Sequence, residues 1–183
     1  MEQHDRNTVL LLLRNGSLRI VVATDVAARG LDIDELGAII NFDLPRERDV
    51  FVHRIGRTAR AGRDGLAISL VQPSDRRTLE ELQLAGVGRE RVPSAEAQLP
   101  PLPATLTIAI QGGRHDRLRP GDIVGALTTA VGIPATDIGK ITVNDRISFV
   151  AVVASVADRA LRGLEAGRIK NKRFRAYLVK APR

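Results

Sequence analysis

The chain has 183 residues, enough for one large domain or two small ones, and 44% of them are hydrophobic and 27% charged, as in folded globular proteins. It has no cysteine and only three scattered histidines, which excludes disulfides, iron–sulfur clusters and thiolate zinc sites, so we expect no metal site. Apolar runs such as residues 9–13 are too short to cross a bilayer, and no secretory signal opens the chain. We therefore expect a cytoplasmic protein without a membrane partner.

The net charge of +7 is unevenly distributed along the chain. Residues 1–103 hold 14 basic and 15 acidic side chains, a net charge of −1, whereas residues 104–183 hold 14 basic and 6 acidic ones, a net charge of +8. This asymmetry predicts two units with different partners, and the partner of the second is expected to be polyanionic. The alternative is a solvated basic surface that serves solubility.

In chain order, the first half is expected to form a helix, two strands, a helix, a strand and a helix. Asn15-Gly16 is typical of a helix end, and short apolar runs that end in polar residues or proline are typical of strands buried on both faces. Strands that alternate with helices indicate parallel pairing in an α/β layer. Because the chain opens on a helix, with no first strand, we expect this domain to be incomplete at its N-terminus. The expected elements are residues 5–14, 20–23, 38–44, 49–60, 67–71 and 77–84.

The prolines of residues 88–103 exclude helix and central strand there, so we interpret this stretch as an extended linker between domains at residues 1–87 and 104–183. The second domain follows the order β-α-β-β-α-β, with Asn144-Asp145 as a hairpin turn. This is the split βαβ arrangement of ferredoxin-like α+β domains, to which RNA-recognition motifs belong. The expected elements are residues 106–110, 120–129, 140–143, 148–153, 156–164 and 173–179.

Two segments of the first half contain candidate ligand-binding residues. Residues 22–33 leave the C-terminal end of an expected strand, where open parallel sheets bind ligands. Residues 53–63 contain an arginine at every third position, and an anion among such like charges would relieve their repulsion. These arginines are Arg54, Arg57, Arg60 and Arg63. The alternative is that they pair with carboxylates, and Arg54 suits an internal brace as well as a ligand. The carboxylates in question are those of Asp25, Asp32, Asp34 and Asp43.

ATDVAARGLDI (residues 23–33) followed by HRIGRTARAG (residues 53–62) resembles motifs V and VI of DEAD-box RNA helicases. NFDLP (residues 41–45) resembles the family's strand–Asp–x–Pro element, and Gln3-x-x-Arg6 fits a short family motif on the preceding helix. The resemblance covers roughly residues 1–87. It implies part of the second RecA-like domain, a parallel-sheet α/β domain.

The resemblance also implies a role for each matching residue. The catalytic arginine fingers, which also bind the ATP phosphates, would be Arg57 and Arg60. The residue on the ribose of ATP would be Asp32. The residues on the RNA backbone would be Arg6, Thr24 and Gly30. The residues that couple the two sites would be Arg29 and His53.

The sequence lacks two parts that hydrolysis of ATP requires. It contains neither a G-x-x-x-x-G-K-[ST] phosphate loop nor an Asp-Glu-Ala-Asp motif. ATP would therefore be shared with a missing N-terminal RecA-like domain, and Mg²⁺ would bind only through that domain. We expect the chain alone to be inactive as an ATPase.

The second domain has few aromatic residues to stack on RNA bases but many cations. Thr107 stands in the first strand where a typical RNA-recognition motif has an aromatic residue, and Phe149 in the third strand is either a core residue or a stacking one. Cations at loops and strand ends would bind phosphates with salt-sensitive affinity. The expected RNA-binding residues are Arg114, Arg117, Lys140, Lys170, Lys172, Arg173 and Arg175.

This half resembles the C-terminal domain of DbpA-like helicases over about residues 104–180. The matching segments are QGGR (111–114), RPGD (119–122), GAL (125–127), IGKI (138–141) and IKNKR (169–173). The resemblance implies a structured hairpin of large-subunit ribosomal RNA as the partner and assembly of that subunit as the role. The full-length protein would be an RNA-dependent ATPase that remodels short duplexes.

Two other readings of the sequence stay open. Residues 104–183 could act as a stand-alone RNA-binding module without ATPase activity. A DNA-unwinding helicase is the third reading, since arginines like those of motif VI occur across a wider group of helicases.

Overall fold

The computed structural model describes residues 2–25, 36–58, 64–82, 88, 90 and 102–182. Contacts divide the chain into two units: residues 1–28 together with 99–183, and residues 29–98. The expected linker lies mostly outside the described residues, so the domain boundaries stay a prediction. None of the helices in the described part of the chain is both long and apolar enough to cross a membrane.

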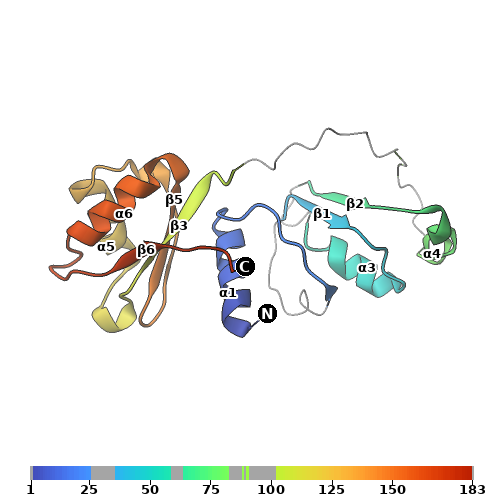
Figure 1. Cartoon of the computed structure of the whole chain (residues 1–183), viewed down its shortest axis with the longest axis horizontal. Coiled ribbons are helices and arrows are strands. Elements are labelled where there is room, and N and C mark those ends of the chain that lie inside the picture. Colours follow the sequence, from blue (N-terminus) through green and yellow to red (C-terminus); the bar gives the residue numbers. More distant parts are fainter. Residues whose placement is uncertain are drawn as a thin grey trace. The chain divides into compact units, whose positions relative to one another are not determined.

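The C-terminal sheet has four antiparallel strands in the order β4-β5-β3-β6 (Figure 1). The strands are β3 (Thr105–Ile110), β4 (Ile138–Val143), β5 (Ser148–Val153) and β6 (Ala176–Leu178). The two central strands, β3 and β5, are separated in sequence by a helix and β4, as the split βαβ arrangement requires. The predicted ferredoxin-like fold is confirmed.

Two helical segments cover one face of this sheet. The first is α5 (Pro120–Gly125), which continues in π-helical geometry over Ala126–Ala130, and the second is α6 (Ala157–Ala166). Pro120 takes a first-turn position, where its missing N–H costs nothing. The core between helices and sheet is fully buried. Its most buried members are Ile108, Ile110, Ile123, Leu127, Val150, Val152 and Ala160.

The N-terminal helix α1 (Gln3–Arg14) belongs to the same unit as this sheet. Its end is a Schellman motif, because the Ser17 amide donates to the Leu12 carbonyl (2.8 Å) and the Gly16 amide to the Leu13 carbonyl (3.0 Å). Gly16 has a positive φ of 69°, which glycine adopts without strain. The expected helix and its end at Asn15-Gly16 are confirmed.

The second unit contains a two-stranded parallel sheet, β1 (Ala38–Asn41) and β2 (Leu66–Ser69). Between the strands lies α3 (Arg48–Ile55), and after them come a 3-10 turn (Pro73–Asp75) and α4 (Arg76–Glu81). The alternation of strands and helices and the parallel pairing are as predicted.

Three expectations for the first half are wrong. Residues 20–23 form no strand, and Ile20 and Val22 are 62% and 95% exposed, because no described strand lies beside them to complete a hydrogen-bonded ladder. The strands β1 and β2 are not buried, as Ile40 and Leu66 show with 62% and 55% exposure. The helix expected over residues 49–60 ends at Ile55, since the backbone turns at Gly56 and then pairs with Leu36.

Candidate nucleic-acid interface

A tight turn presents the two lysines near the C-terminus. Ile169 and Lys172 exchange two backbone hydrogen bonds (2.9 and 3.0 Å), so Lys170 and Asn171 form a two-residue hairpin turn. Both central residues have positive φ, 51° and 65°, as a type I′ turn requires. Lysine rarely adopts this conformation, and such departures cluster at functional sites. The turn is therefore a feature to explain.

A second loop carries the arginines that follow β3. It begins at Gly112 and Gly113, where side chains have no room: a Cβ on Gly112 would lie 2.3 Å from the Phe174 ring, and one on Gly113 would lie 2.2 Å from the Asn144 carbonyl oxygen. The loop continues as a 3-10 turn (Arg114–Asp116) and ends at Arg117, which has a positive φ of 60°. Close packing thus fixes the backbone at the start of the loop that carries these arginines.

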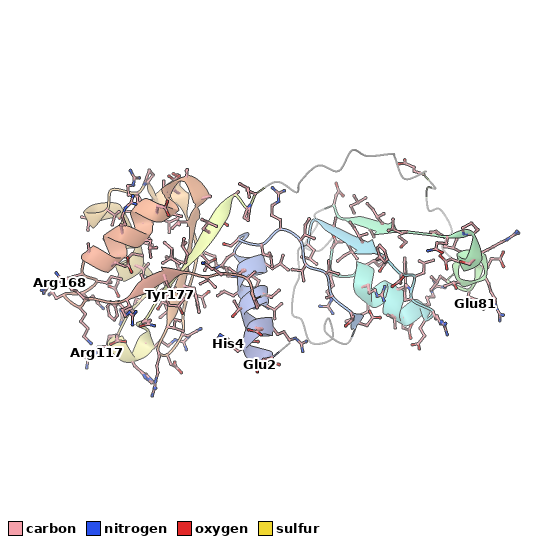
Figure 2. All side chains as sticks on the ribbon, viewed as in Figure 1. Glu2, His4, Glu81, Arg117, Arg168 and Tyr177 are labelled. Carbon is pink, nitrogen blue, oxygen red and sulfur yellow. The ribbon has the colours of Figure 1, made fainter. Side chains whose placement is uncertain are left out.

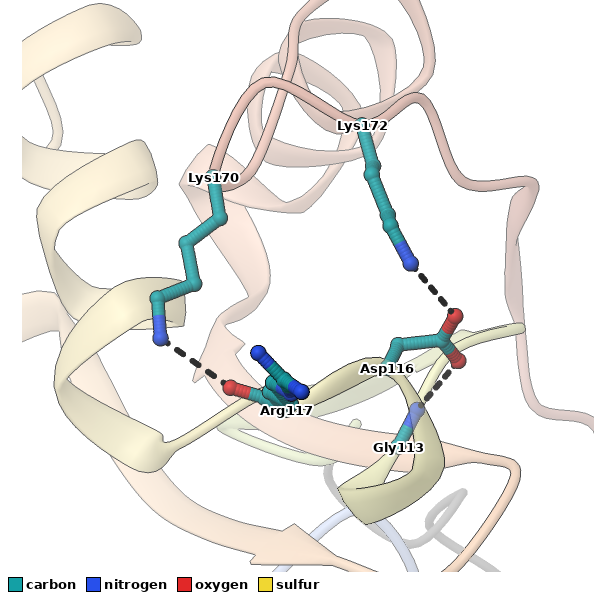
Figure 3. Close-up of polar contacts among 5 residues, drawn as sticks. All are labelled: Gly113, Asp116, Arg117, Lys170 and Lys172. Carbon is teal, nitrogen blue, oxygen red and sulfur yellow. Dashed lines mark hydrogen bonds and ion pairs between the residues drawn. The ribbon is translucent and has the colours of Figure 1, made fainter.

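The Asp116 carboxylate and the Arg117 carbonyl connect the loops into one cluster, which we call the cation cluster: Arg114, Arg117, Lys170 and Lys172. Figure 3 shows Arg117, Lys170 and Lys172 of this cluster with Asp116. The Nζ of Lys172 lies 3.3 Å from the Asp116 carboxylate, whose other oxygen accepts the Gly113 amide at 3.3 Å. The Nζ of Lys170 donates to the Arg117 carbonyl (3.1 Å) and pairs with Asp122 at 3.2 Å. Arg114 pairs more loosely with Asp145, at 3.6 Å.

The electrostatics of the cluster keep both aspartates ionised. The Gly113 amide and then Lys172 lower the pKa of Asp116. For Asp122, partial desolvation raises the pKa, but the hydrogen bonds from the Arg119 amide and Lys170 outweigh it, so the pKa is lowered overall. A carboxylate that accepts hydrogen bonds in its charged form holds its cationic partners in place. The lysines are thus positioned while their ammonium groups stay accessible.

The other RNA-binding residues expected in the second domain are exposed but are not part of this cluster. Lys140 is an exposed residue of β4, and Arg173 and Arg175 are exposed residues that precede β6. The sequence reasoning missed Arg168, whose guanidinium donates to the Asn171 carbonyl (3.5 Å) beside the lysine turn. Arg117 and Arg168 both project into solvent (Figure 2).

The anchoring role of Asp116 was also missed. The available signal was an aspartate three residues after Gly113, the spacing at which a side chain caps the start of a helical turn. That signal predicts a cap and not a lysine partner, because the lysine comes from a segment 56 residues away.

The strand register shows on which face of the sheet Phe149 lies. It lies opposite Ala109 on β3, which in turn lies opposite Tyr177 on β6. Side chains alternate between the faces of a strand, and Ile108, Ile110 and Val150 belong to the core, so Phe149 and Tyr177 lie on the face away from α5 and α6. Phe149 is therefore not a residue of the main core.

In the first half, Arg54 is an internal brace. Its guanidinium donates to the Asn41 side chain (3.1 Å) and to the Asp43 carbonyl (3.0 Å), and the buried Asn41 also bonds Ser69. The bond to Asp43 thus goes to its backbone carbonyl. This contact ties α3 to both strands of the parallel sheet.

Arg57 lies just after the end of α3, and its guanidinium contacts the His53 ring. Thr24 is exposed, and Arg6 is half-buried on α1. The structure thus brings together one predicted arginine finger and one predicted coupling residue. Outside the described residues lie the predicted sites Arg29, Gly30, Asp32 and Arg60, together with Arg63.

Comparison with known proteins gives two family matches, one in each half of the chain. The helicase conserved C-terminal domain matches residues 1–62, and the DbpA RNA binding domain matches residues 107–177. The chain is 44% identical to the ATP-dependent RNA helicase DbpA of Escherichia coli (strain K12), over 98% of the chain and 40% of that protein. The chain carries a helicase conserved C-terminal domain followed by a DbpA RNA binding domain, and it is similar over nearly its whole length to DbpA-type DEAD-box RNA helicases.

Two further relatives show how the similarity is distributed. DbpA of Bacillus subtilis (strain 168) is 32% identical over 96% of the chain and 42% of that relative. The ATP-dependent RNA helicase SrmB of Escherichia coli (strain K12) is 52% identical over 49% of the chain and 19% of that relative. The chain spans less than half the length of the DbpA relatives.

Proposed function

We propose that the chain is the part of an ATP-dependent RNA helicase that anchors RNA and closes on the nucleotide. Its substrate would be a structured hairpin of large-subunit ribosomal RNA, remodelled in the cytoplasm during assembly of that subunit. The observation that carries the proposal is the cation cluster, positioned over Asp116 and Asp122. The DbpA relatives are named as ATP-dependent RNA helicases, which supports the coupling of ATP to this RNA contact.

The cluster can bind phosphates without losing its internal pairs. The side chains of Lys170 and Lys172 are 45% and 60% exposed, and each ammonium group carries three donors. A phosphate oxygen can therefore join the carboxylate as a second acceptor. Positioned cations on several loops suit the backbone of a folded RNA, since binding releases counterions from each phosphate contacted.

The test is RNA binding by the 183-residue chain at several salt concentrations. We expect the double variant K170A/K172A to bind a hairpin RNA about tenfold more weakly, with a salt slope shallower by about 2. The physical reason is the loss of two phosphate contacts, while the turn that carries them keeps its backbone hydrogen bonds.

The matched control removes the same charge elsewhere. Arg159 and Arg162 are exposed residues of α6, so R159A/R162A lowers the net charge equally without touching the cluster. Equal losses in the two variants would show a diffuse basic surface and overturn the assignment. Tighter binding of DNA than of RNA of equal length would favour a DNA-unwinding helicase.

The nucleotide half of the proposal concerns Arg57, Arg60 and Asp32. The Arg57 guanidinium lies against the His53 ring just after the end of α3, and a guanidinium suits phosphate oxygens. Among the described residues, no group of three or more metal-ligating side chains is present, so Mg²⁺ would be held by the domain that carries the phosphate loop. ATP supplies the phosphoryl group, and this chain supplies guanidinium groups that stabilise its charge.

Two ATPase measurements test this half. The chain alone should show no RNA-stimulated turnover, because it lacks the phosphate loop; clear turnover would contradict the proposal. In a chimera in which residues 1–62 replace the matching segment of Escherichia coli DbpA, R57A/R60A should lower kcat by about 10³-fold or more. RNA affinity should be unchanged, and a loss of affinity with intact kcat would assign these arginines to RNA.

A further inference from the structure

The end of α1 makes three hydrogen bonds with two threonines of β3. The Asn15 Nδ2 donates to the Thr107 Oγ1 (3.1 Å), and the hydroxyl groups of Ser17 and Thr107 lie 2.7 Å apart. The Thr105 hydroxyl donates to the Asn15 carbonyl at 2.7 Å. That carbonyl is one of the groups that a helix end leaves without an internal partner, so Thr105 completes the cap.

This contact is buried and closely fitted. Thr107 is 1% exposed, Asn15 is 7% and Leu12 is 2%. A Cβ on Gly16 would lie 3.2 Å from the Thr105 Oγ1, closer than most contacts of real Cβ atoms. Buried polar groups are costly unless they are hydrogen-bonded. Here the strand satisfies the Asn15 Nδ2 and carbonyl, while the buried Asn15 Oδ1 has no hydrogen-bond partner. Figure 1 shows α1 beside the sheet.

The position of the contact on the sheet bears on whether this face can bind RNA bases. Thr105 and Thr107 alternate with the core residue Ile108 and its neighbours, so they lie on the same face as Phe149 and Tyr177. Thr107 occupies the strand position where a typical RNA-recognition motif places a ring for base stacking. A threonine there is too small to stack, but its hydroxyl can both donate and accept, which suits the contact with Asn15 and Ser17.

We propose that the β3 end of this sheet face, at Thr105 and Thr107, is the docking surface for the C-terminal end of α1 and not a surface for RNA bases. The helix belongs to the segment that matches the helicase domain, and the strand leads into the segment that matches the RNA-binding domain. The contact therefore ties the helix of Arg6 directly to the RNA-binding fold. This inference goes beyond the proposed function and stands without it.

The absence of cysteine from the chain allows a direct test by cross-linking. In the full chain, S17C/T107C places two thiols where two hydroxyl groups now touch. With oxidised glutathione, we expect an intramolecular disulfide to form at least about tenfold faster than in S17C/E165C. Glu165 lies on α6, which covers the other face of the sheet. Equal rates in the two variants would overturn the proposal.

A second measurement separates docking from RNA recognition. We expect T107F, which overfills the contact, to increase amide exchange at Leu12–Ser17 about tenfold, with the exchange of β5 and the affinity for a hairpin RNA unchanged. T107S keeps the hydroxyl and should restore protection. If saturating hairpin RNA prevents the S17C/T107C disulfide, or if T107F tightens RNA binding, the face belongs to RNA and the proposal is wrong.

Discussion

The two sheets of this protein differ in what covers them. In the antiparallel sheet, Ile108 and Val150 are 0% exposed, because α5 and α6 cover one face and α1 contacts the other. In the parallel sheet, Ile40 is 62% and Ile68 is 40% exposed. Both sheets have apolar strands, so strand composition alone does not decide burial. The number of paired strands and covering helices does.

The difference follows from the way each sheet type is built. An antiparallel sheet of four strands with two helices on one face is a complete layer pair and can fold by itself. Parallel strands are normally buried on both faces, which requires further strands and helices on both sides. We therefore expect residues 104–182 to form the stable part of the chain and β1 and β2 to be only marginally stable.

Hydrogen exchange gives the largest expected difference. Amides of β3 and β5 should exchange only through global unfolding, whereas those of β1 and β2 should exchange on the order of 10³-fold faster through local opening. The measurement is native-state exchange of the full chain, followed by NMR or mass spectrometry. Equal protection of the two sheets would contradict the comparison.

Core truncation gives a smaller effect that depends on the sheet. I108A should destabilise the C-terminal unit by about 2–5 kcal/mol, because it leaves a cavity in a closed core. The matched variant I40A should change stability by less than about 0.5 kcal/mol, because that side chain is already exposed. Tyr177 is the only tyrosine and there is no tryptophan, so tyrosine fluorescence during urea unfolding reports on this sheet alone. A transition that I40A shifts as much as I108A would show that the two units unfold together.

Lowering the pH is expected to have the smallest effect on stability, and it tests one contact within the C-terminal unit. The pKa of Asp116 is lowered in the folded state, by the Gly113 amide first and Lys172 second, so the unfolded state binds the proton more readily. The stability that this group contributes is present above its ordinary pKa and is lost as the pH falls through the lowered value. Between about pH 5 and pH 3, the melting temperature of the wild type should therefore fall more than that of D116N. Identical slopes would show that the Asp116 contacts contribute nothing to folding.

Much of the fold could be predicted from patterns a few residues long. Asn15-Gly16 indicated the end of α1, Asn144-Asp145 indicated the turn between β4 and β5, and the order of elements indicated the ferredoxin-like domain. Prediction failed at residues 20–23 and at the end of α3. An apolar run becomes a strand only if a neighbouring strand accepts its hydrogen bonds, and helical spacing after Ile55 does not reveal that the backbone turns to pair with Leu36.

The site was predicted to a similar degree. The cations were identified from local charge, and Lys170 and Lys172 do lie in a loop beside Arg117. Their carboxylate partners come from segments about 50 residues away. Motif spacing in the sequence does not reveal contacts between residues that far apart. The role of Thr107 also depended on register, since only the paired strands show which face it occupies and that α1 reaches it.

The left-handed turn at Lys170 and Asn171 has a consequence for the selectivity of the proposed RNA contact. A flexible lysine loses rotational freedom when a phosphate fixes it, and that loss weakens binding. Here the backbone conformation and the contact with the Arg117 carbonyl have fixed much of that freedom during folding. In the RNA contact proposed above, the turn would therefore be a preorganised template that favours RNAs whose phosphate spacing already matches it over longer and more flexible strands.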